Sequence, residues 1–495
     1  MQHVFSLISL YFRRHILFVS TLLVSAAIVA LYNRSLFIAP AGDDWLLLHP
    51  VSQMVRDRGV GGALTAIFRT PVGDFYRPLA LLPMLVAMHA LIWIQLAKLG
   101  FLVILYFVVA STARRIGLPD LWSVFVGVAT VLHQVFTSVA TEIDLWGDLI
   151  SALGFALLIY TCIRYSNRQL QMRSLLGLTV LLTVITLLSK EAGVACFMIP
   201  LLFSVLRPFP LESEQHRGLL ASAGAMLMII VVYFMIRQAL GLKSSGEEDY
   251  YALHFGANVF KNGILALAAL FSPMNTVFVA RDGGAWKALA MMWTVLGLVV
   301  ASSGLIVFLR HGKWRLPVVL FAAALIVQGP VLLMPHLTEA NFTRSLALGW
   351  LAFALTAHAI VIPDSATWIR RLAVVMVSIW LISDLTAVRH KSNDIVTGQQ
   401  RAARFRQELH VELPVPPARL ITLAILDPGY QGYSVYHQPL YVDFRDGEIP
   451  FGVRELYQDP RLDIRYVVVK DRDGAKANAA DYLVTDAGDV TSLNQ

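Results

Sequence analysis

Long apolar runs recur along most of this chain, and they limit its fold more than any other feature. A run of about twenty such residues is long enough to cross the hydrocarbon core of a bilayer as a helix. Helices suit that setting because each one satisfies its own backbone hydrogen bonds without water. Hydrophobic residues make up 57% of the 495 residues and charged residues only 15%, which excludes an ordinary soluble domain. We therefore predict an all-α polytopic membrane protein.

The apolar runs predict about eleven membrane spans if each span takes roughly twenty residues. They cover 15–37, 91–113, 119–137, 148–164, 174–189, 192–206, 217–237, 286–309, 315–334, 345–362 and 369–387. The fifth and sixth spans are short and meet at Ser189-Lys190-Glu191. A re-entrant hairpin is therefore an alternative at that point.

Basic residues gather at one set of span ends. Arg13 and Arg14 precede the first span, and Arg114, Arg217 and Arg310 lie at the same predicted face. Because cytoplasmic loops carry the excess of lysine and arginine, this pattern places the N-terminus in the cytoplasm. It also accounts for the net charge of +7 without nucleic-acid binding. The outer loops are then 38–90, 138–147, 189–191, 238–285, 335–344 and all residues after 388.

The composition of the chain changes after residue 388, where it becomes charged and polar. Short strand-like runs follow, separated by proline, glycine and aspartate. They lie at 419–426, 439–444 and 464–470. We therefore predict two domains: a transmembrane domain at 1–387 and a small soluble α/β domain at 388–495 on the outer face.

The first outer loop, 38–90, is too long to be a simple connector, and it carries adjacent carboxylates at Asp43 and Asp44. Its segments 45–57 and 79–89 are apolar enough to lie as helices on the membrane surface. A carboxylate in this loop can act as a general base toward an acceptor hydroxyl. The alternative is an ordinary loop pair that caps the helix that follows it.

Three basic side chains at the outer face are candidates for binding phosphate. Arg77, which follows Tyr76 in the sequence FYRPL, can hold a phosphate with two parallel hydrogen bonds, and Arg344 begins a later span at the same face. Lys190 and Glu191 interrupt a long apolar stretch, where charges are costly and typically functional. The alternatives are arginines that anchor at the membrane interface and a tight turn whose charges face water.

Four further polar residues near the outer face are candidates for orienting substrates. His133 can contact the phosphate or the acceptor, or it can be a packed histidine satisfied by a neighbouring helix. Glu142, Asp144 and Glu339 can contribute to an acceptor site, or they can be solvated loop acids. Asp44 with Glu142 or Asp144 could bind one divalent cation, Mg²⁺ or Mn²⁺, whereas lysine and arginine clamps would make a metal unnecessary.

Four segments together resemble the GT-C superfamily of glycosyltransferases, which use polyprenyl-phosphate-linked sugars. They are GDDW after the first span, FYRPL at the end of the first outer loop, the segment from His133 to Asp148, and LLSKEAGV. Within the superfamily, the chain is most similar to the protein O-mannosyltransferases that bear tetratricopeptide repeats and to their bacterial relatives. The resemblance covers about residues 15–360.

The resemblance implies a GT-C fold with a catalytic acidic motif in the first outer loop, here Asp43 and Asp44. It also implies basic groups that hold a lipid phosphate, for which Arg77, Lys190 and Arg344 match best. The tetratricopeptide repeats are absent and the tail is short and different. Together with the basic inner loops, this suits a bacterial inner-membrane enzyme whose acceptor is not implied by the resemblance.

We therefore expect an inverting glycosyltransferase that acts at the periplasmic face. Its donor would be a polyprenyl-phosphate sugar. The sequence lacks the GxGxxG and GxxxxGK[ST] motifs, so it gives no sign of a domain that binds a nucleotide sugar. Its acceptor would be a hydroxyl on an envelope glycan, a glycolipid or a secreted protein such as a pilin. Glu191 would orient Lys190 or the sugar, and Tyr76 would help to orient the site.

Two other functional classes stay open. A lipid-linked-sugar flippase or other transporter usually has internal repeats, which this sequence lacks. An O-antigen-type polymerase or ligase would place its main functional residues in a large late outer loop, whereas the acidic motif here lies in the first one.

Overall fold

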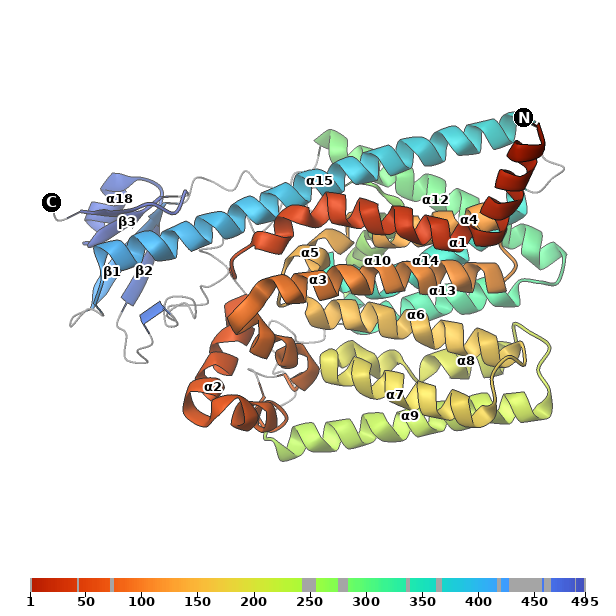
Figure 1. Ribbon diagram of the computed structural model, residues 1–495, viewed down its shortest axis with the longest axis horizontal. Coiled ribbons are helices and arrows are strands. Elements are labelled where there is room, and N and C mark those ends of the chain that lie inside the picture. Colours follow the sequence, from red (N-terminus) through yellow and green to blue (C-terminus); the bar gives the residue numbers. More distant parts are fainter. Residues whose placement is uncertain are drawn as a thin grey trace.

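The computed structural model is a bundle of long helices that carries a small β-sheet beyond one end (Figure 1). It describes residues 2–41, 44–71, 75–242, 255–274, 284–334, 339–361, 367–415, 420–426, 456–457, 464–485 and 487–493. The N-terminus lies at one end of the bundle, and helix α2 and the sheet lie at the other (Figure 1). This second end is called the outer end below, after the orientation predicted from the loop charges.

Eight helices in the described part of the chain are long and apolar enough to cross a membrane. They are α1 (Gln2–Tyr32) from His15 onward with the 3₁₀ helix η1 (Asn33–Phe37), α3 (Pro78–Arg115) from Ala90 onward, α6 (Trp146–Ser166), α7 (Met172–Ser189), α9 (Ser213–Ala239), α12 (Gly284–Arg310), α13 (Arg315–Leu332) and α15 (Thr367–Glu412). Each overlaps a predicted span, although α15 continues to Glu412, well beyond the span predicted at 369–387. The predicted class, a helical multi-pass membrane protein, is confirmed.

The other three predicted spans form shorter or less apolar helices. Segment 119–137 is divided into α4 (Asp120–Val131) and α5 (Phe136–Thr141). Segment 192–206 begins with the 3₁₀ helix η2 (Glu191–Ala195) and continues as α8 (Met198–Leu206). Segment 345–362 is the 18-residue α14 (Thr343–Ile360). The division of the first of them has a clear cause. The backbone N–H of Gln134 donates to Asp384 Oδ1 at 3.1 Å, and Lys391 donates to the Gln134 carbonyl at 3.2 Å. These two α15 side chains thus supply hydrogen bonds to the backbone of the turn, which lipid could not provide.

The first outer loop contains the two predicted surface helices. Helix α2 (Asp44–Ile67) bends at Gly59, whose φ of +68° favours glycine, and the next helical segment, Pro78–Met88, leads into α3. The two pack through a separate hydrophobic core that includes Leu48, Val51 and Met84. This core gives the loop a fixed place at the outer end of the bundle.

Helix α15 connects the membrane bundle to the sheet. It has 46 residues, which makes it roughly 70 Å long at 1.5 Å per residue, more than twice the thickness of the hydrocarbon core. It runs beside α1 and, because of its length, continues past the outer end of the bundle (Figure 1). The predicted domain division at 387/388 falls inside this continuous helix.

The sheet has four strands in the order β2-β1-β3-β4. They are β1 (Ile421–Leu426), β2 (Ile464–Val469), β3 (Tyr482–Val484) and β4 (Val490–Ser492); β1 is parallel to β2 and β3, and β4 is antiparallel to β3. One face packs on Phe405 and Leu409 of α15, and the short helix α18 (Arg472–Ala477) covers the other. The predicted strands at 419–426 and 464–470 are confirmed, and 439–444 lies outside the described residues. Helix α10 (Ala257–Phe271) lies within the segment 238–285, which was predicted as an outer loop.

Candidate functional site

A buried carboxylate with two cationic partners lies at the outer end of the bundle. Asp148 is in the first turn of α6 and is fully buried. Arg344, in the first turn of α14, donates from Nε and Nη2 to Asp148 Oδ1 at 3.0 and 2.5 Å. Lys190 Nζ donates to the other oxygen, Oδ2, at 2.8 Å. One carboxylate therefore connects α6, α14 and the turn after α7.

A second ion pair follows directly along the chain. Arg77 Nε and Nη2 both donate to Glu191 Oε2, at 2.7 and 2.6 Å. The guanidinium also lies over the ring of Phe75, 3.8 Å from its centroid, where a cation–π interaction helps to fix it. About a fifth of each side chain of this pair is exposed. Glu191 Oε1 has no hydrogen-bond partner among the described residues.

Two glycines allow these charges to approach one another. A Cβ atom at Gly147 would lie 2.5 Å from the carbonyl oxygen of Ser189, so α6 begins directly against the end of α7. A Cβ atom at Gly193 would lie 2.6 Å from the backbone nitrogen of Leu187. The chain leaves α7 through an extended Lys190 and folds back as η2. This close return explains why the sequence Lys-Glu-Ala-Gly needs its glycine.

The ion-pair cluster, defined here as Arg77, Asp148, Lys190, Glu191 and Arg344, contains three cations and two carboxylates. Its net charge is positive at the end of a membrane bundle, which favours an anionic ligand. The structure thus brings together all three predicted phosphate-binding cations. It also shows that each already has a carboxylate partner, and that Lys190 is paired with Asp148 and not with Glu191.

Asp44 lies in a different arrangement, which we call the loop clamp. Its Oδ1 accepts the backbone N–H groups of Ile143 and Asp144 at 2.8 and 2.9 Å, and its Oδ2 accepts the N–H of Ala41 at 3.0 Å. Only 1% of Asp44 is exposed. Burial raises the pKa of this carboxyl, and the three amide donors and the nearby Lys98 oppose that rise. The carboxylate therefore binds backbone rather than facing an open cavity.

Lys98 completes the loop clamp from the opposite side. It is fully buried in α3, and its Nζ donates to the carbonyl of Glu142. One turn earlier, Gln95 Nε2 donates to the carbonyl of Thr141 at 2.8 Å. The loop between α5 and α6 is thus held through its carbonyl groups by α3 and through its amide groups by Asp44. Sequence reasoning missed Lys98, although a lysine inside a predicted span is a strong signal of function.

The remaining predicted site residues are placed as follows. The hydroxyl of Tyr76 donates to the Phe68 carbonyl at 3.1 Å, and its own carbonyl accepts from Tyr233 at 3.0 Å, so Tyr76 supports the backbone next to Arg77. His133 is fully buried, its Nδ1 accepts the N–H of Val135, and its ring packs against Trp380. The ring is therefore packed among neighbouring helices, but its Nε2 has no hydrogen-bond partner among the described residues, so it is not the fully satisfied histidine of the packed alternative.

The other acidic residues predicted for the site lie near the loop clamp or have side chains outside the described part of the structure. Glu142 is 5% exposed, and Asp144 contributes its N–H to Asp44. Glu339 begins the 3₁₀ helix η3 (Glu339–Phe342), but its side chain lies outside the described part. Asp43 also lies outside it. Among the residues that the structure describes, no group of three His, Cys, Asp or Glu side chains could hold a metal ion.

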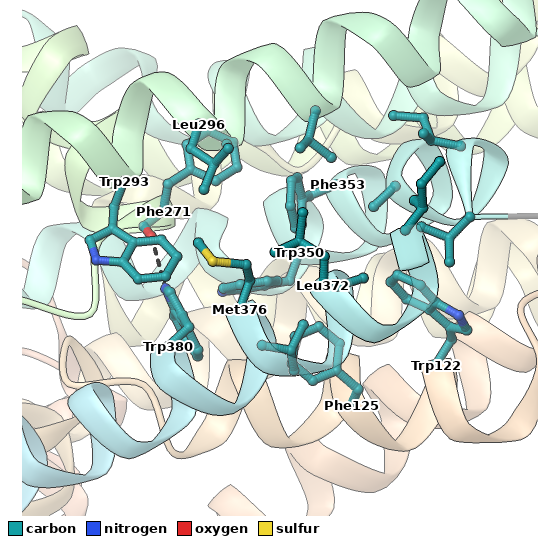
Figure 2. Close-up of a pocket in the computed structure, with 18 residues that line it drawn as sticks. Trp122, Phe125, Phe271, Trp293, Leu296, Trp350, Phe353, Leu372, Met376 and Trp380 are labelled. Carbon is teal, nitrogen blue, oxygen red and sulfur yellow. Dashed lines mark hydrogen bonds between the residues drawn. The ribbon is translucent and has the colours of Figure 1, made fainter. Parts of the chain in front are cut away.

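An apolar cavity of about 270 Å³ lies between α4, α10, α12, α14 and α15. Figure 2 shows its aromatic lining, which includes Trp122, Trp293, Trp350 and Trp380. The indole N–H of Trp380 is turned aside to donate to the Phe271 carbonyl at 2.8 Å, drawn as the dashed line (Figure 2). Because every lining residue is apolar, this cavity offers no acid, base or phosphate ligand.

Comparisons with known proteins find similarity to solved structures but not to a protein family. The chain matches no protein-family model and no curated protein. It is similar to a crystal structure of the oligosaccharyltransferase from Archaeoglobus fulgidus in its apo form, with 12% sequence identity and a TM-score of 0.48. The match covers 95% of this chain and 67% of the archaeal one. A likeness at this level assigns neither a family nor an activity.

Proposed function

We propose that this chain is a membrane glycosyltransferase that moves a sugar from a polyprenyl phosphate to an acceptor hydroxyl, with inversion at the anomeric carbon. The observation that carries the proposal is the ion-pair cluster, which gathers Arg77, Lys190 and Arg344 at the outer end of the bundle. The resemblance of the GDDW, FYRPL and LLSKEAGV segments to the GT-C superfamily supports it. A net positive site beside lipid suits a lipid-linked phosphate.

The two ends of the cluster have different roles in this proposal. Arg77 and Lys190 each expose about a fifth of their side chains, so they would contact the donor phosphate. Arg344 is only 3% exposed, so it would not contact the phosphate itself. It would fix the position of Asp148, and Asp148 would orient Lys190 toward the phosphate. Glu191 would fix Arg77. As the sugar departs, negative charge grows on the phosphate, and prearranged cations stabilise it.

The base is proposed to be Asp43, with Asp44 holding the loop. The acceptor oxygen attacks the anomeric carbon, the bond from that carbon to the phosphate oxygen breaks, and the hydroxyl proton passes to the carboxylate. Asp44 is less suited to this step because it is buried and accepts three backbone N–H groups. Asp43 directly precedes it in the chain.

The reaction is proposed to need no divalent cation. The carboxylates considered for a metal, Asp44, Glu142 and Asp144, already have the buried ammonium of Lys98 as their neighbouring positive charge. The acceptor is proposed to be an envelope glycan, a glycolipid or a secreted protein at the periplasmic face of a bacterial inner membrane. The orientation rests on the basic inner loops.

The test is transfer by the full chain in nanodiscs, supplied with radiolabelled polyprenyl-phosphate hexoses and pentoses. Asp43→Asn and Arg77→Gln should each lower the transfer rate about 100-fold, the usual cost of losing one such group. Arg173→Gln, an exposed arginine at the opposite end, is the control and should transfer normally. Normal transfer by both site variants would contradict the proposal. Movement of the lipid across the bilayer with no transfer would favour the transporter class.

A further inference from the structure

An arginine near the C-terminal end of α15 contacts both sides of the Asp43-Asp44 pair. Arg406 Nη2 donates to the carbonyl of Pro40 at 3.2 Å, and its guanidinium lies 4.4 Å from the ring centroid of Trp45. The indole N–H of Trp45 donates to the same Pro40 carbonyl at 3.2 Å. Residues 40 and 45, which flank the two aspartates, are therefore tied to each other and to α15.

The path of this turn determines where the Asp44 carboxylate lies. Within the turn, the N–H of Asp44 donates to the Ala41 carbonyl at 3.1 Å, and Asp44 Oδ2 accepts the N–H of Ala41. On the bundle side, Asp44 Oδ1 is fixed by the amides of Ile143 and Asp144. Arg406 fixes the same turn through Pro40 and Trp45.

The C-terminal sheet packs on the same turn of α15. A Cβ atom at Gly488 would lie 2.4 Å from the carbonyl oxygen of Arg401, and Gly488 has a φ of +88° that favours glycine. Arg404 and Asp489 form an ion pair of 2.5 Å, and Phe405 enters the core of the sheet. Arg406 is thus presented by a stretch of helix that the sheet holds in place.

We infer that Arg406 is a positioning residue for the first-loop aspartates, through which the C-terminal part of the chain sets the geometry of the site. The inference rests on the proposed function for its effect on transfer. Arg406 acts on the turn through its contacts with Pro40 and Trp45. Because small misplacements of a catalytic group are costly, loss of this hold should lower kcat about 10- to 100-fold while the KM for the donor stays unchanged.

The test compares Arg406→Ala, Arg406→Lys and an exposed arginine of the same helix, Arg389→Ala, in the full chain. The first readout is amide hydrogen exchange of peptides that cover 38–47, with peptides from β1 as a folding control. The second readout is kcat and KM for transfer. Arg406→Ala should speed exchange in 38–47 alone and lower kcat. Arg406→Lys, which keeps the charge but loses the planar fork, should lie between, and Arg389→Ala should match the wild type.

Exchange and kcat of Arg406→Ala at wild-type values would overturn the inference. A fall in kcat with unchanged exchange in 38–47 would also overturn it, because the effect would not pass through the turn. Should the wild-type chain transfer no sugar, the proposed function fails, and the exchange readout alone decides whether Arg406 holds the turn. If Arg406→Ala does not fold, Arg406→Lys provides both readouts.

Discussion

Two buried aspartates at the outer end of this bundle are held in opposite ways. Asp148 is bound by the charged side chains of Lys190 and Arg344, whereas Asp44 is bound by three backbone N–H groups. A carboxylate held by cations belongs to an electrostatic site, because the same cations can respond to a second anion. A carboxylate held by amides fixes the course of the chain. The comparison separates the proposed phosphate-binding role of one aspartate's partners from the loop positioning by the other.

The largest expected effect is at Asp148. Asp148→Asn removes the charge that faces two cations, one of them buried, and should lower the free energy of unfolding by about 3–5 kcal/mol. Chemical denaturation in mixed micelles measures this. Asp120→Asn is the control, because its ion pair with Arg114 is similarly short but well exposed, and exposed pairs contribute at most about 1 kcal/mol. Equal effects at the two positions would mean that Asp148 is not held as described. In the double variant Asp148→Asn/Arg344→Gln, part of the stability should return.

A smaller effect is expected where the chain folds back after α7. Gly193→Ala places a methyl group against the backbone of Leu187 and should cost about 3 kcal/mol, in the range for overpacked sites. Gly177→Ala, on α7 with nothing within 4 Å of the added atom, should be neutral or slightly stabilising. The same denaturation measurement compares them. If Gly193→Ala were as stable as Gly177→Ala, the turn would not be closely packed.

Asp44→Asn should cost about 2 kcal/mol, less than Asp148→Asn. The new amide keeps one acceptor oxygen but turns a donor toward one of the backbone N–H groups that Asp44 now accepts, so that one buried donor loses its partner. The binding of a polyprenyl phosphate should not change, because the Asp44 carboxylate is bound by Ala41, Ile143 and Asp144, which lie outside the ion-pair cluster. A loss of binding as large as that in Arg77→Gln would erase the distinction between the two aspartates.

The smallest effect on stability is expected at Glu191. Its pair with Arg77 is partly exposed, so Glu191→Gln should change the free energy of unfolding by less than about 1 kcal/mol. Transfer should nevertheless fall about tenfold, because Arg77 is no longer aimed at the phosphate. Initial rates at saturating donor measure this. Unchanged transfer would show that Phe75 alone suffices to fix Arg77.

The sequence was sufficient for the features that depend on local composition. The span predicted at 91–113 is helical from Ala90 to Arg115, and the gathering of Arg77, Lys190 and Arg344 followed from placing all three at one face. The pairing among them was not predictable, because Asp148 and Arg344 meet across 196 residues. The interruption of segment 119–137 likewise depends on Asp384 and Lys391, far along the chain.

Lys98 is a different case, because its signal is present in the sequence alone. A lysine within the span predicted at 91–113 is costly unless buried against a partner, and its partner is the carbonyl of Glu142. Arg406 carried no such signal. An arginine on a polar helix is ordinary, and its contact with Pro40 appears only when α15 lies beside the first outer loop.

The most direct test of the ion-pair cluster is the binding of a polyprenyl monophosphate to the purified chain, measured by titration in nanodiscs. Arg77→Gln and Lys190→Met should each raise Kd at least about tenfold, which corresponds to about 1.4 kcal/mol, while Asp44→Asn should leave Kd unchanged. Wild-type affinity in both cation variants would contradict the claim that this cluster binds the donor phosphate.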